Sequence, residues 1–123
     1  MKQLKILVVD DKKVIGDFFN LTLGYYGHHI SVVHDLPNTL EALRSDNFDI
    51  AFIDIMMPCH DGVEVLKEVK AISPGLAVVM MSGYTIEEKR EHCARLGAVG
   101  CLKKPFEVDD IRHVIKEAIG QDI

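Results

Sequence analysis

In the stretch KILVVDDKKV, Lys5 to Val14, an apolar and largely β-branched run is followed by two adjacent carboxylates. Continuous apolarity, without alternation of polar residues, is typical of a strand that is covered on both faces of a sheet. Asp10 and Asp11 stand where this strand leaves the core, and like charges placed side by side repel each other. The stretch therefore predicts a buried strand that delivers an acidic pair to the edge of a sheet.

The same pattern recurs along the chain, where short apolar runs alternate with helical patterns. Residues 4–9, 29–34, 50–53, 77–81 and 99–102 are the strand candidates, and residues 12–26, 37–45, 63–72, 85–96 and 108–119 are the helix candidates. Five βα units in series predict a doubly wound α/β domain with a parallel sheet, right-handed crossovers and helices on both faces.

The carboxyl ends of parallel strands lie at one edge of a sheet, where ligands bind beside the switch point in strand order. Polar residues follow four of the predicted strands there: Asp10 and Asp11, Asp54, Ser82 and Lys104. Four segments that are distant in sequence are thus expected to meet at one rim.

Three carboxylates at one rim need a cation to neutralise their repulsion. A set of oxygen ligands without His or Cys favours Mg²⁺, with Mn²⁺ as the alternative, over zinc. Asp54 would then have an oxygen available to attack phosphorus as a covalent nucleophile. The Lys104 ammonium and the Ser82 hydroxyl would hold the phosphoryl oxygens.

Composition limits the class of protein. A chain of 123 residues with 48% hydrophobic content suits one domain, residues 1–123. The formal net charge of −5, without a basic block, argues against direct binding of nucleic acid. Three cysteines without C-x-x-C spacing, no apolar run near ~20 residues and a polar start favour a cytoplasmic protein that does not enter the membrane.

From end to end the sequence resembles the receiver domain of two-component response regulators. Four motifs carry the resemblance, in order and each at a strand end: LVVDD at 7–11, FIDIMMPCHDG at 52–62, VVMMSGY at 78–84 and LKKPF at 102–106. The resemblance implies a flavodoxin-like, three-layer (βα)5 fold with strand order 2-1-3-4-5. It also implies a phosphoacceptor signalling domain rather than an enzyme with sustained turnover.

The matched motifs imply a role for each rim residue. Asp54 would accept a phosphoryl group from a sensor histidine kinase or a histidine phosphotransfer protein. Asp10, Asp11 and Asp54 would bind Mg²⁺ together with the backbone carbonyl of Met56. On its own, an acidic pair after a strand is more often a helix N-cap, and the match at Asp54 reverses that interpretation.

Further positions of the family concern the switch. Ser82 and Lys104 fall on its Ser/Thr and lysine positions, and Gly83 would leave room for the phosphoryl group. Met56 and Tyr84 stand where members vary the lifetime of the phosphorylated state. The helix at 85–96, the fifth strand and the last helix would form the output surface, which implies control of a partner or output domain and a phosphorylation-dependent homodimer.

One position departs from the family pattern. Receivers usually carry Tyr or Phe on the fifth strand, and this chain has Cys101. A thiol cannot turn inward as a ring does, so we expect output to run through the loop at 83–86, with Tyr84 as the moving ring.

Two other function classes are alternatives to a phosphoacceptor switch. An aspartate-nucleophile phosphatase usually shows D-x-D, whereas Asp54 is followed by Ile55 and Met56. A phosphorylation-independent interaction module would be favoured by loss of an acid, Ser82 or Lys104, and none is lost. The sequence leaves open the cognate kinase, the pathway, the lifetime of the phosphorylated state, and whether the chain acts alone or within a longer protein.

Overall fold

The computed structural model describes residues 3–57, 60–83 and 87–123. Within these residues five parallel strands form one sheet in the order β2-β1-β3-β6-β7. Numbered among themselves along the chain, the strands have the order 2-1-3-4-5, which confirms the predicted flavodoxin-like fold. The strands are β1 (Lys5–Val9), β2 (His29–Val33), β3 (Ile50–Asp54), β6 (Ala77–Ser82) and β7 (Gly100–Lys103).

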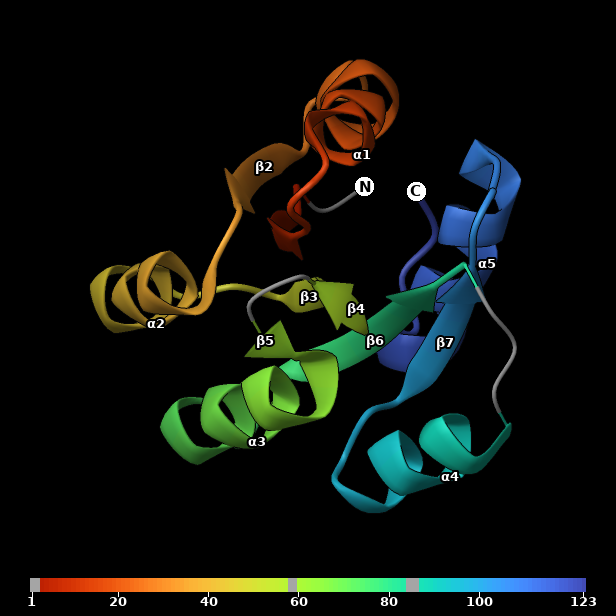
Figure 1. Ribbon diagram of the computed structural model, residues 1–123. Helices are drawn as coiled ribbons and strands as arrows, with labels where there is room; N and C mark the ends of the chain where they lie inside the picture. The colour runs from red at the N-terminus through yellow and green to blue at the C-terminus, as the bar shows by residue number, and fades with distance from the viewer. Residues whose placement is uncertain (1–2, 58–59, 84–86) are drawn as a thin grey trace.

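Helices cover both faces of the sheet (Figure 1). One face packs against α2 (Leu36–Ser45), α3 (Gly62–Ile72) and α4 (Glu87–Arg95), and the other against α1 (Lys13–Phe19) and α5 (Val108–Ile119). None of the helices in the described part of the chain is long and apolar enough to cross a membrane.

Alternate side chains of β1 enter two separate cores. Leu7 and Val9 pack in the cluster that contains Leu66 of α3, whereas Ile6 and Val8 pack with Phe19 of α1. All four strand residues are fully buried, and each such side chain stabilises the fold by about 1.5–3 kcal/mol. Burial on both faces is the reason that this strand reads as continuously apolar.

The helix predicted for 12–26 is not uniform. It is α-helical to Phe19 and continues as a π-helical segment, η1 (Asn20–Gly24). The Thr22 hydroxyl donates a hydrogen bond of 2.7 Å to the carbonyl of Phe18 and competes there with the helical ladder. Helical periodicity alone does not distinguish the two forms.

A small antiparallel pair was not predicted. β4 (Met56–Met57) pairs with β5 (His60–Asp61) directly after β3. The Asp61 side chain accepts a hydrogen bond from Val63 N–H at 2.9 Å and caps α3. The predicted start of the helix at 85–96 lies outside the described residues, and α4 is described from Glu87 onward.

Lowering the pH below about 6.5 is expected to destabilise the protein through His28. This side chain is buried, its Nδ1 accepts a hydrogen bond of 3.0 Å from Leu4 N–H, and burial lowers its pKa. Between the lowered pKa and the ordinary one, the unfolded chain binds a proton that the folded chain does not, so the free energy of unfolding falls as pH falls.

Denaturant unfolding from pH 7.5 to 5 measures this dependence. His28→Asn is the matched variant, because its amide oxygen can accept the same hydrogen bond and does not titrate. We expect a shallower loss of stability in the variant. Equal slopes for the two proteins would contradict the assignment.

Candidate functional site

Four segments meet at the carboxyl edge of the sheet. Asp10 follows β1, Asp54 ends β3, Ser82 ends β6 and Lys104 follows β7. The central strands β1, β3 and β6 are neighbours, and β7 lies next to β6. The Lys104 N–H donates to the Ser82 carbonyl at 2.7 Å, which holds the two strand ends together. The predicted convergence is therefore present in the structure.

The three acids form one cluster. Asp10, Asp11 and Asp54 each offer a carboxylate oxygen, and these oxygens lie within 4.8 Å of one another. Asp10 and Asp54 are buried, whereas Asp11 is exposed. An arrangement of oxygen donors with one open side suits Mg²⁺, which keeps several waters while it binds carboxylates.

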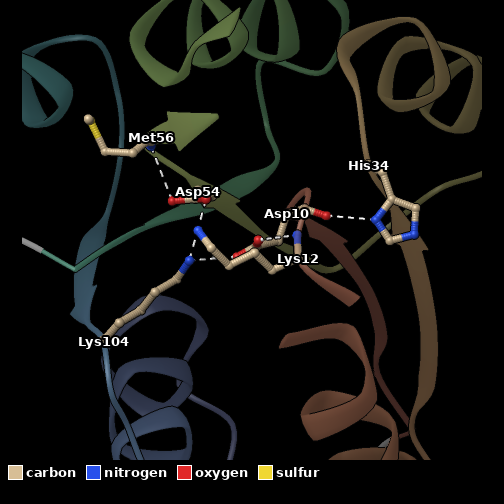
Figure 2. Close-up of polar contacts among 6 residues, drawn as sticks. All are labelled: Asp10, Lys12, His34, Asp54, Met56 and Lys104. Carbon is tan, nitrogen blue, oxygen red and sulfur yellow. Dashed lines mark hydrogen bonds and ion pairs between the residues drawn. The ribbon is translucent and has the colours of Figure 1, made fainter. Parts of the chain in front are cut away.

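The Lys104 ammonium points to the two buried acids of this cluster (Figure 2). Its ammonium Nζ lies 2.7 Å from Asp10 Oδ2 and 3.4 Å from Asp54 Oδ2. The lysine side chain is mostly buried, so these contacts are little screened by solvent. One positive charge thus faces the two buried carboxylates.

Asp54 is buried with one carboxylate oxygen hydrogen-bonded and the other not. Its Oδ1 accepts a hydrogen bond of 3.1 Å from Met56 N–H, while its buried Oδ2 has no hydrogen-bond partner. Burial is the main cause that raises the pKa of Asp54, and the nearby Asp10 charge raises it further. The hydrogen bond from Met56 N–H and the Lys104 ammonium lower this pKa and offset part of the rise. A further cation would favour the charged carboxylate, so a divalent metal fits these residues.

Comparison with known proteins supplies the family. The family model described as the response regulator receiver domain matches residues 6–116. The chain belongs to this family. The Escherichia coli transcriptional regulatory protein ZraR is 29% identical over 117 residues, which are 95% of this chain and 26% of ZraR. The sporulation initiation phosphotransferase F of Bacillus subtilis is 29% identical over 95% of this chain and 94% of its own length.

Solved receiver structures share the fold. The chemotaxis protein CheY4 of Vibrio cholerae superposes with a TM-score of 0.89 at 26% identity, covering 96% of this chain and all of CheY4. This receiver spans about a quarter of the length of ZraR.

The remaining predicted positions lie around the receiver's acid cluster. The Ser82 side chain is buried, and Gly83 beside it is exposed. Chain neighbours aside, no heavy atom of the described residues lies within 4 Å of where a Gly83 Cβ would stand. The role of Gly83 in leaving room for a phosphoryl group stays a prediction. The Met56 side chain is 47% exposed, and its carbonyl as a metal ligand stays a prediction. Tyr84 lies outside the described residues.

Two contacts in the site were missed by the sequence interpretation. Lys12 N–H donates to Asp10 Oδ1 at 2.9 Å, and the ring of His34 contacts the Asp10 main chain (Figure 2). Lys12 contributes only its backbone here, so its side-chain type carries no signal. His34 was missed because its partner is a main-chain carbonyl, which no sequence motif records.

Cys101 lies beside a cavity of this receiver. The cavity has a volume of about 190 Å³ and lies between α4 and the sheet, with Ile55, Met80, Cys93 and Ala94 among its lining residues. Cys101 is half-buried and pairs in register with Met80. A thiol at this position therefore leaves space between the strand and the helix that a larger side chain would fill.

Replacing Cys101 with phenylalanine is expected to stabilise the protein by about 0.5–1 kcal/mol, because the ring would fill part of this cavity. Thermal unfolding measures the change. Cys101→Ala is the matched control, since it enlarges the cavity and should lower the melting temperature. A melting temperature that falls in both variants would show that the cavity cannot receive a ring.

Proposed function

We propose that this receiver domain accepts a phosphoryl group on Asp54 and passes the signal on by a change of conformation. The observation that supports the proposal is the position of the Asp54 carboxylate, which is buried beside two further acids and within 3.4 Å of the Lys104 ammonium. A receiver that binds without phosphorylation would not need this set. We also propose residues 1–123 as one receiver unit.

The reaction is a phosphoryl transfer from a phosphohistidine of a sensor histidine kinase or phosphotransfer protein. A carboxylate oxygen of Asp54 bonds to phosphorus, the phosphorus–nitrogen bond breaks, and the electron pair leaves with the imidazole. Mg²⁺ bound by Asp10, Asp11 and Asp54, with the Met56 carbonyl, would neutralise the charge of the carboxylates and the phosphoryl oxygens.

Two residues of the chain respond to the added group. The Lys104 ammonium, now paired with Asp10 at 2.7 Å, would turn to a phosphoryl oxygen. The hydroxyl of the buried Ser82 would donate to another oxygen. Both contacts exist only in the phosphorylated state, so they favour one conformation over the other, as a population shift requires.

The phosphoryl donor would approach along α1. This helix begins at Lys13, directly after the acidic pair, and continues into η1. Val14, Leu21 and Tyr25, spaced by seven and four residues, are 67%, 77% and 83% exposed. This apolar stripe begins at the end of α1 that follows the acidic pair, and it suits a docking helix of the kinase or phosphotransfer protein.

Incubation with acetyl phosphate and Mg²⁺, followed by intact-mass measurement, tests the proposal. We expect the wild type to gain one phosphoryl group, and we expect no gain when EDTA replaces Mg²⁺. The absence of any gain with Mg²⁺, from acetyl phosphate and from a phosphohistidine donor alike, would overturn the proposal.

Phosphorylation is also expected to produce a homodimer through α4, β7 and α5. A groove between these elements is lined by Arg90, Val99, Asp110, His113 and Glu117 among others. Charges of both signs next to the half-exposed Val99 allow the surface to pair with a second copy. Sedimentation with beryllofluoride and Mg²⁺, compared with Mg²⁺ alone, measures this, and an unchanged mass would contradict it.

A further inference from the structure

Two hydrogen bonds connect Asp10, in the turn between β1 and α1, to the end of β2 and to the residue that follows it. Asp10 N–H donates to the Val33 carbonyl at 3.1 Å, and His34 Nδ1 lies 2.7 Å from the Asp10 carbonyl oxygen. Because a carbonyl only accepts, Nδ1 must carry the proton and donate it. Figure 2 shows the imidazole facing this carbonyl from the side opposite to Lys104.

His34 is itself well anchored. It directly follows the last residue of β2, and the next residue, Asp35, is the N-cap of α2. The Asp35 side chain accepts a hydrogen bond from Asn38 N–H at 2.8 Å. The strand before His34 and the capped helix after it restrict its backbone. The ring can therefore hold the Asp10 carbonyl in place although the side chain is exposed.

The acid that most needs such support is Asp11. Asp10 is held by Lys12 N–H and Lys104, and Asp54 by Met56 N–H. In the described part of the chain no hydrogen bond or ion pair holds the exposed side chain of Asp11. The direction of its Cα–Cβ bond depends on how the peptide that joins it to Asp10 is oriented, and the carbonyl of that peptide is the one that His34 binds.

We infer that His34 is a positioning residue for the divalent-cation site: through the Asp10 carbonyl it orients the Asp10–Asp11 peptide and so aims the Asp11 carboxylate. The inference rests on the proposed function, because it assigns the cation to these acids. Groups that orient metal ligands without touching the metal commonly change metal affinity when they are removed.

Calorimetric titration of Mg²⁺ into the metal-free protein tests the inference. His34→Ala is expected to weaken Mg²⁺ binding by roughly fivefold to tenfold. His34→Asn, whose amide nitrogen can take the place of Nδ1, should bind within about twofold of the wild type. His29→Ala is the matched control, since His29 is an exposed histidine of β2 that contacts the Ser31 side chain, and its affinity should not change.

A second measurement separates positioning from a loss of stability. Hydrogen exchange of the Asp10 amide, which donates to the Val33 carbonyl, should be faster in metal-free His34→Ala than in the metal-free wild type, with the amides of β1 unchanged. Equal Mg²⁺ affinities of His34→Ala and the wild type would overturn the inference, as would an affinity of His34→Asn as weak as that of His34→Ala. A wild type that binds no Mg²⁺ would instead overturn the cation assignment within the proposed function.

Discussion

Replacing Asp54 with asparagine is expected to abolish phosphoryl uptake completely while making the protein more stable at neutral pH. The amide has no anionic oxygen to attack phosphorus. Among the described residues, no other carboxylate of β3 belongs to the acid cluster, so none can take the place of Asp54. Intact-mass measurement after incubation with acetyl phosphate and Mg²⁺ should show a label on the wild type alone.

The gain in stability follows from the raised pKa of Asp54, whose first cause is burial. Between the ordinary pKa of a carboxyl group and the raised one, the folded chain binds more protons than the unfolded chain. The stability therefore falls as pH rises through that window, and the penalty is fully present above it. Asparagine does not titrate, so it removes the penalty, while Lys104 keeps its contact with Asp10 at 2.7 Å.

The two readouts together exclude misfolding as the cause of the lost label. Asp122→Asn is the matched control, because that carboxylate is exposed and lies outside the acid cluster. It should be labelled like the wild type and unfold at the same denaturant concentration. A labelled Asp54→Asn protein would move the phosphoacceptor to another residue.

Gly62→Ala is expected to destabilise the protein by about 3 kcal/mol, the largest effect on stability that we predict for a single methyl group. A Cβ at Gly62 would lie 2.4 Å from Ile55 Cα, 2.7 Å from the Ile55 carbonyl oxygen and 2.8 Å from the Asp54 carbonyl oxygen. All three are backbone atoms at the end of β3. The clash therefore cannot be relieved by the rotation of a side chain, and the backbone itself would have to move.

The same clash reaches the phosphorylation site. Gly62 N–H donates to the Ile55 carbonyl at 3.0 Å, so a displaced helix start would shift the segment that carries Asp54. We expect slower labelling by acetyl phosphate in addition to a fall of roughly 10 °C in melting temperature. Gly75→Ala is the control, because its Cβ would meet no heavy atom of the described residues within 4 Å apart from its chain neighbours. Equal melting temperatures of the two variants would show that β3 and α3 can separate without cost.

The fold class could be predicted because burial on both faces leaves a direct trace in the sequence. A strand such as β1 must be apolar at every position, and the polar residues that follow it mark the carboxyl edge. Parallel topology then brings these edges together, so the meeting of Asp10, Asp11 and Asp54 could be expected before any coordinate was known.

Local backbone form was less predictable. The π-helical turn of η1 and the short β4–β5 pair depend on hydrogen bonds of single residues, such as that of Thr22 to Phe18. These bonds leave the hydrophobic period unchanged, so a pattern of apolar residues does not report them.

The sequence by itself determined the layers of this protein, the strand order through its family motifs, and the identity of the side chains at the carboxyl edge. Only the tertiary structure decided how those side chains are held: Lys104 between two buried carboxylates, and His34 on the Asp10 carbonyl. The physical reason is that buried positions require apolar residues, so the sequence shows which segments are buried. A hydrogen bond to a main-chain carbonyl depends instead on where the folded chain places an atom that every residue has. The distance between two charges depends likewise on where the fold places the side chains that carry them.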